Sequence, residues 1–187
     1  MPVFGHNIFS GKFIVTLAAL LLLLCAPGTG KAEEAQQIEY RIKTAFLYNF
    51  SRFVVWPESA MQEHSEFSLC TPGETLFAEQ LDTLIGKAAH NKAIVVKRFS
   101  QLQEVLHCKL VFIGEKQDLS ETLWILQGQP VLTVSNIAGF TENAGMVQFH
   151  LPDHKVRFRT NADAATRAGL TVNSKLLSLA FDDSGSR

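Results

Sequence analysis

The chain has 187 residues, of which 47% are hydrophobic, 19% charged and 10% aromatic. This composition is typical of one globular domain and excludes a disordered, collagen-like or coiled-coil chain. The 17 lysines and arginines against 18 aspartates and glutamates give a formal net charge of -1. The broad basic field of a nucleic-acid-binding protein is therefore missing, and nucleic acid is not an expected partner.

The first 32 residues have the pattern of a secretory signal peptide. A short segment ending at Lys12 precedes an apolar run over 13–24, and Gly30-Lys31-Ala32 supplies small residues where signal peptidase cleaves. The run is shorter than the about 20 apolar residues that a membrane span needs. We expect export to the periplasm with cleavage of residues 1–32; a lipoprotein form anchored through Cys25 is the alternative.

The segment 35–55 is predicted to form a helix that packs in the core. Its apolar side chains recur at three- and four-residue steps, at Ile38, Ile42, Phe46, Phe50 and Phe53. Trp56-Pro57 ends the helix, because the residue before a proline disfavours the helical conformation. An exposed helix on a membrane surface would have a face richer in lysine and arginine.

From residue 67 onward, runs typical of strands alternate with runs that have helical spacing. The predicted strands are 67–70, 93–99, 109–113 and 130–134, and the predicted helices are 75–85, 101–106 and 118–127. Such alternation indicates a mainly parallel sheet with helices on both faces.

The pattern changes near residue 145. Residues 146–150 and 155–159 alternate apolar and polar side chains around a Pro-Asp turn, which predicts an antiparallel hairpin. Two helices follow: 162–168, with Asn161 as N-cap and Gly169 after its end, and 174–181, with Asn173 as N-cap. The predicted fold class is α/β: a single-domain layered sandwich over 33–181, with a mainly parallel sheet, a C-terminal antiparallel hairpin and helices on both faces. Residues 182–187 are predicted to be a flexible tail.

Signatures of common catalytic sites are missing from the sequence. It contains no G-x-S-x-G, no Walker A loop, no G-x-G-x-x-G and no H-E-x-x-H. His150, Asp153 and His154 could converge on a metal, but a solvated turn explains their polarity without one and a site needs a further ligand of known geometry. We therefore expect a non-enzymatic protein with no metal or cofactor; an exported hydrolase with a dispersed site is an alternative.

The mature chain keeps two cysteines, Cys70 and Cys108, in a compartment where disulfides persist. They can pair if their Cα atoms lie within about 4.4–6.8 Å; the alternative is two buried, inert thiols. Cys70 ends one predicted strand and Cys108 precedes another, so an ideal parallel pair would place them at opposite ends of the sheet. A bond requires an offset register or a loop that folds back.

Local strings along the whole mature chain resemble the YfiR family of exported proteins. The matching strings are Tyr40–Phe50 with Phe53–Pro57, Leu69-Cys70, Cys108 before 110–113, 130–135, and Val156–Phe158 leading to Asn161, Ala165, Leu170 and Ser174–Leu177. The resemblance implies a periplasmic repressor of an inner-membrane diguanylate cyclase, which lowers cyclic-di-GMP signalling and biofilm output. It also implies release by an outer-membrane lipoprotein, a homodimer, and a Cys70–Cys108 pair. A second cysteine pair of some members is missing from 142–152.

A repressor of this kind needs an exposed aromatic-rich patch for its partner. The candidate aromatic residues are Tyr48, Trp56 and Phe140, for which core packing is the alternative. At the level of function, the alternative is a periplasmic domain that senses or binds a small molecule, in the crevice that an open α/β sheet offers.

Overall fold

The computed structural model describes residues 29–62, 65–73, 75–114 and 118–180. The apolar run of the predicted signal peptide and the predicted tail 182–187 lie outside these residues. The chain divides into two units, Met1–Ile38 and Glu39–Arg187, and the packing described below is that of the second unit. Within the described ranges, no helix combines the length and the apolar character that crossing a membrane requires.

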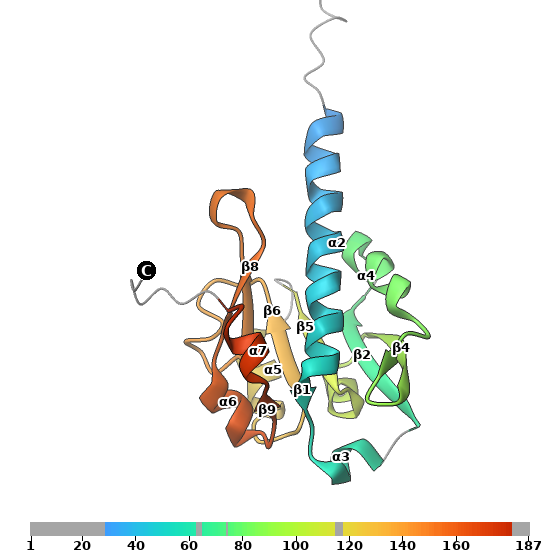
Figure 1. Ribbon diagram of the computed structural model, residues 1–187, viewed down its shortest axis with the longest axis vertical. Helices are drawn as coiled ribbons and strands as arrows, with labels where there is room; N and C mark the ends of the chain where they lie inside the picture. The colour runs from blue at the N-terminus through green and yellow to red at the C-terminus, as the bar shows by residue number, and fades with distance from the viewer. Residues whose placement is uncertain (1–28, 63–64, 74, 115–117, 181–187) are drawn as a thin grey trace, which may run out of the picture. The chain divides into compact units, whose positions relative to one another are not determined.

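A seven-stranded sheet forms the centre of the second unit (Figure 1). In spatial order its strands are β3 (Ala88–Ala89), β4 (Lys92–Phe99), β2 (Glu66–Pro72), β5 (Leu110–Ile113), β6 (Leu132–Ser135), β7 (Val147–His150) and β8 (Arg157–Thr160). The five strands from β4 to β7 run parallel, and β3 and β8 pair antiparallel at the two edges. This arrangement confirms the predicted α/β class and the predicted C-terminal hairpin.

The helices are mostly shorter than predicted. They are α2 (Thr29–Phe53), α3 (Glu58–Gln62), α4 (Leu76–Leu81), η1 (Asp82–Leu84), η2 (Leu102–His107), α5 (Leu119–Ile125), η3 (Pro152–His154), α6 (Ala162–Arg167) and α7 (Ser174–Leu177). The η segments are 3-10 helices. The sequence predictions missed α3, the edge strand β3, and a separate antiparallel pair made by β1 (Val54–Val55) and β9 (Thr171–Val172).

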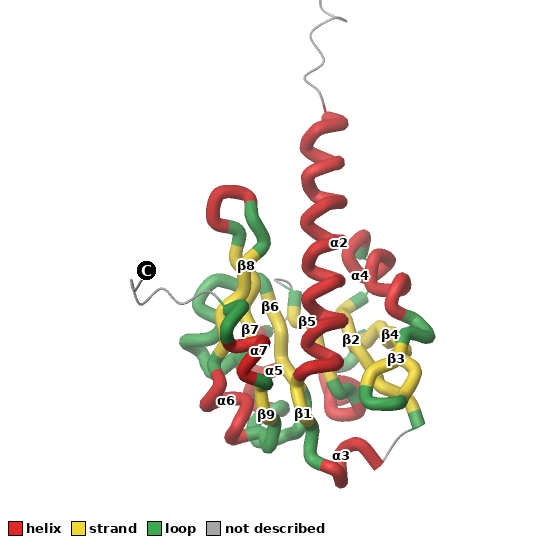
Figure 2. The backbone as a smooth tube through the Cα atoms, in the orientation of Figure 1, coloured by secondary structure: helices red, strands yellow, loops and turns green. Residues whose placement is uncertain are grey.

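One face of the sheet packs against α2 and α4 (Figures 1 and 2). Phe50 on α2 is only 1% exposed, and its ring centroid lies 5.0 Å from that of Phe158 and 5.9 Å from that of Phe149. We call this core the α2-side cluster; its large, fully buried members include Leu47, Phe50, Phe67, Leu69, Leu81, Ile94, Leu110, Phe149 and Phe158.

The buried face of α2 differs from the predicted one. Ile42, expected in the core, is 40% exposed, whereas its neighbour Lys43 is 3% exposed. The Lys43 ammonium pairs with Glu39 and lies 5.9 Å from the centre of the Phe149 ring. A lysine stem is apolar and can pack in a core while its charge meets a carboxylate and an aromatic face. The α2 prediction was therefore correct for Phe50 and wrong for Ile42 and for Ile38, which is 41% exposed.

The opposite face packs against η2 and α5. Its core is smaller, and we call it the η2-side cluster: Cys70, Phe99, Val105, Cys108, Val111, Ile113, Leu126, Val131 and Phe140. Phe140 sits against Gly145, where an added Cβ would come within 2.3 Å of the phenyl ring. A side chain at position 145 would therefore displace Phe140 from this core.

Candidate protein-binding surface

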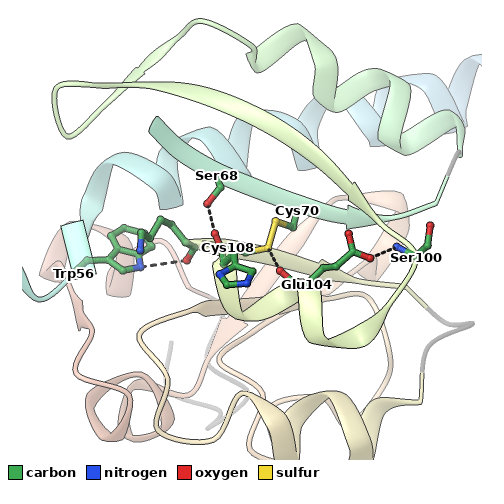
Figure 3. Close-up of a disulfide and its surroundings, with 8 residues drawn as sticks. Trp56, Ser68, Cys70, Ser100, Glu104 and Cys108 are labelled. Carbon is green, nitrogen blue, oxygen red and sulfur yellow. Dashed lines mark hydrogen bonds between the residues drawn. A yellow bond between two sulfur atoms is a disulfide. The ribbon is translucent and has the colours of Figure 1, made fainter. Parts of the chain in front are cut away.

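Cys70 and Cys108 are joined by a disulfide with a Cα–Cα distance of 5.9 Å (Figure 3). The offset register and the returning segment that such a bond requires are both present. Strand β2 continues past Cys70 to Pro72, and Cys70 pairs with Val111 rather than with the start of β5. The 3-10 helix η2 then returns over this face and places Cys108, its C-cap, next to Cys70.

Hydrogen bonds close the start of η2 and tie its end to the sheet. At the start, the Glu104 carboxylate accepts hydrogen bonds from the backbone N–H groups of Gln101 and Ser100, at 2.7 and 3.1 Å. At the end, the Ser68 hydroxyl of β2 donates to the His107 carbonyl at 2.8 Å. Both disulfide residues are almost fully buried, at 1% and 2% exposure. Their geometry suits a structural cross-link more than exchange with another thiol.

The three aromatic candidates occupy different environments. Trp56 is buried, and its indole N–H donates to the Lys109 carbonyl at 3.2 Å. Phe140 belongs to the η2-side cluster. Tyr48 is half-buried on α2, and its hydroxyl donates to the Ala88 carbonyl at 3.4 Å. Of the three, only Tyr48 reaches the surface.

Tyr48 belongs to a line of alternating cations and aromatic rings, which we call the cation–aromatic row: Lys87, Tyr48, Arg52, Phe53 and Lys175. The Lys87 ammonium and the Arg52 guanidinium lie 5.3 and 5.4 Å from the centre of the Tyr48 ring. Arg52 and the Lys175 ammonium lie 5.5 and 5.7 Å from the centre of the Phe53 ring. All four distances are within the range of a favourable cation–π contact.

Three elements bring the row together. Tyr48, Arg52 and Phe53 lie in the last two turns of α2, which ends as the chain enters β1. The backbone N–H of Asn173 donates to the Phe53 carbonyl at 3.4 Å, and the Asn173 side chain caps α7, so Lys175 lies next to Phe53. The hydroxyl of Tyr48 holds the turn that carries Lys87.

Within the described ranges, the charges of the row have no acidic partner. Other cations form ion pairs, as Arg98 does with Asp82 at 2.7 Å and Arg159 with Glu142 at 3.8 Å. Among the described residues, no carboxylate pairs with the three cations of the row. Apolar side chains adjoin it in the chain: Val55 in β1 is 52% exposed and Leu177 in α7 is exposed.

Sequence reasoning found one member of the row and missed the other four. The spacing of Tyr48 and Arg52 predicts that they are neighbours on a helix. Lys87 and Lys175 join them only through tertiary contacts, for which the sequence carries no local signal.

The candidate metal residues lie at the tip of the β7–β8 hairpin. His150 ends β7, while Asp153 and His154 lie in the turn with φ values of 49° and 59°. The described ranges hold no group of three His, Cys, Asp or Glu side chains that could bind a metal ion. Burial, with the positive charges of Arg159 and Arg157, lowers the pKa of His150 from its usual value of 6.5.

The geometry thus combines an unpaired basic surface with a buried cross-link. A family model described as YfiR/HmsC-like matches residues 40–181, which include every described member of the row and both cysteines.

Proposed function

Because the chain belongs to the YfiR/HmsC-like family, we propose that it is a periplasmic, non-enzymatic regulator that binds and represses an inner-membrane diguanylate cyclase. Engagement of the cyclase's periplasmic part lowers cyclic-di-GMP synthesis and biofilm output. The family is regulatory rather than catalytic, which supports a binding function.

The cation–aromatic row is the observation that identifies a candidate surface for contact with the cyclase. Arg52, Lys87 and Lys175 are held over aromatic rings and have no carboxylate partner within the described part of the chain. A carboxylate of the partner can form a charge-assisted hydrogen bond with such a cation. The entropic cost of binding is small, because the cation's side chain is already held by the aromatic ring. Val55, which follows Phe53 by two residues and is 52% exposed, offers apolar area for the contact. We propose that the row binds an acidic segment in the periplasmic part of the cyclase.

The test combines one triple variant with a matched control. The row variant is Arg52→Gln, Lys87→Gln and Lys175→Gln; the control is Arg41→Gln, Lys97→Gln and Lys155→Gln, which removes equal charge from exposed positions outside the row. Co-purification of the cyclase from envelopes and the cellular cyclic-di-GMP level are measured for each, together with the melting temperature.

We expect the row variant to lose between about 3-fold and about 160-fold in affinity, because three exposed charge contacts contribute roughly 0.2–1 kcal/mol each. Cyclic-di-GMP rises accordingly, while the control behaves like the unmodified chain. Equal loss in both variants would show that only net charge matters and that the row is not the surface. Failure of the unmodified protein to retain any diguanylate cyclase would overturn the function itself.

We also propose that export removes residues 1–32 and leaves 33–181 as the functional domain. N-terminal sequencing of protein released by osmotic shock should begin at Glu33. An intact residue 1, or a lipid on Cys25, would contradict this.

The resemblance also supports a homodimer and displacement by an outer-membrane lipoprotein. Light scattering of the exported protein tests the first, and competition of that lipoprotein with the cyclase tests the second. A monomer, or retention of the cyclase at saturating lipoprotein, would refute the respective proposal.

A further inference from the structure

A cleft lies between α5 and α6, on residues that the cation–aromatic row does not use. Its volume is about 550 Å³, and its walls come from Trp124 and Leu126 at the end of α5 and from Ala164 and Arg167 on α6. Thr133 of β6 and Met146 also line it. Clefts of about 300–1,000 Å³ are the size that small organic ligands occupy.

Hydrogen bonds fix the walls of this cleft. The Thr133 hydroxyl accepts from the backbone N–H of Met146 at 3.0 Å, which joins β6 to the segment before β7. The Asn161 side chain accepts from the backbone N–H of Ala164 at 2.9 Å and donates to the Thr141 carbonyl at 2.9 Å. A ligand therefore meets a largely preformed site and does not have to order these segments.

Two side chains give the cleft its chemical character. The Trp124 indole is 75% exposed, while Leu126 and Met146 beside it are buried. Arg167 is the cleft's charged side chain, and no acidic side chain of the described ranges forms an ion pair with it. An aromatic surface favours a planar ring, and a guanidinium favours a carboxylate, which it can bind with two parallel hydrogen bonds.

We propose that the α5–α6 cleft binds a small organic acid in which a carboxylate is attached to a planar ring. The ring packs on Trp124 and the apolar floor, and the carboxylate pairs with Arg167. This inference goes beyond the proposed function, because it adds a small-molecule site on residues separate from the partner-binding surface.

Benzoate, acetate and benzyl alcohol are the probes, because the second lacks the ring and the third lacks the charge. The exported protein has two tryptophans, so the indole N–H region of its NMR spectrum contains one signal from buried Trp56 and one from Trp124. The variant Trp124→Phe assigns the two signals. Arg167→Gln tests the cation, and Arg41→Gln is its matched control on α2.

We expect benzoate to shift the Trp124 signal saturably and to leave that of Trp56 in place. Acetate and benzyl alcohol should bind at least about tenfold more weakly, and Arg167→Gln should lower benzoate affinity by about tenfold, as loss of a hydrogen bond to a charged group predicts. A linear, non-saturating response to benzoate, or equal affinity of Arg167→Gln and Arg41→Gln, would overturn the proposal. Cyclase binding by Arg167→Gln is expected to be unchanged, so failure here is distinguishable from failure of the regulatory proposal.

Discussion

The two faces of the central sheet are held by different means. On the α2 side, long and aromatic side chains interdigitate, and Phe46 and Phe50 pack against Phe149 and Phe158 at centroid distances of 5.0 to 6.1 Å. On the η2 side, a smaller cluster lies under a six-residue 3-10 helix. Such a helix has poor hydrogen-bond geometry and is uncommon beyond three or four residues. The disulfide and the Ser68 hydrogen bond join η2 to β2 and thus supplement the packing of the smaller cluster.

The largest expected effect tests the α2 side. Phe50→Ala removes a fully buried ring from between two others, and we expect the free energy of unfolding to fall by about 3–5 kcal/mol through lost burial and a residual cavity. Urea unfolding followed by circular dichroism measures this. Ile42→Ala, on the exposed side of the same helix, is the control and should change stability by less than about 0.5 kcal/mol. A loss below about 1 kcal/mol for Phe50→Ala would mean that the aromatic cluster does not dominate this face.

The second effect tests the η2 side. Replacing both cysteines, Cys70→Ala with Cys108→Ala, should lower stability by about 2–4 kcal/mol, because a closed loop of this length restricts the unfolded chain. Reductant should destabilise the unmodified protein and leave the double variant unaffected. Alkylation under denaturing, non-reducing conditions should find no free thiol in the exported chain.

Hydrogen exchange separates the two faces further. The cysteine variant should lose protection first in η2, by local opening, whereas Phe50→Ala should lower protection throughout the sheet. Unchanged stability together with lost cyclase repression on reduction would make the disulfide a redox switch and not a structural cross-link.

The sequence predicted the features of both faces that depend on local patterns. Asn161 and Asn173 cap α6 and α7 as expected, with side chains that accept from the backbone N–H groups of Ala164 and Lys175. Gly169 follows α6 with a φ of 74°, the left-handed conformation that a glycine after a helix adopts. The strands that were predicted lie where expected for the same reason, since alternation and apolar runs are local signals.

Features that depend on distant segments were not predictable. One residue step turns a helix by about 100°, so Ile42 and Lys43 cannot both face the core. Lys43 takes the buried position, where it contacts Glu39 and Phe149, although hydrophobic periodicity favours Ile42. The disulfide depends on the register of β2 with β5, which places Cys70 opposite Val111. The cation–aromatic row likewise forms only because the turn after η1 brings Lys87, and the start of α7 brings Lys175, next to aromatic rings of α2.

A smaller effect isolates the polar part of the η2 side. Ser68→Ala removes the hydroxyl that donates to the His107 carbonyl, and we expect a loss of about 1 kcal/mol, typical of one hydrogen bond. Ser120→Ala, at an exposed position in α5, serves as the control. If Ser68→Ala were neutral in the oxidised protein and destabilising only without the disulfide, the hydrogen bond and the disulfide would be redundant in holding η2 to β2.

The smallest expected effect lies at the hairpin that borders the α2 side. Because burial and the charges of Arg159 and Arg157 lower the pKa of His150, the unfolded chain binds a proton at this site more readily than the folded chain does. Stability therefore decreases as the pH falls through the unfolded value of 6.5 toward the lower folded value, and the contribution vanishes above that window. His150→Gln should flatten this part of the curve of unfolding free energy against pH. If the slope of unfolding free energy against pH were unchanged in His150→Gln, the pH dependence would arise from another group and not from this hairpin.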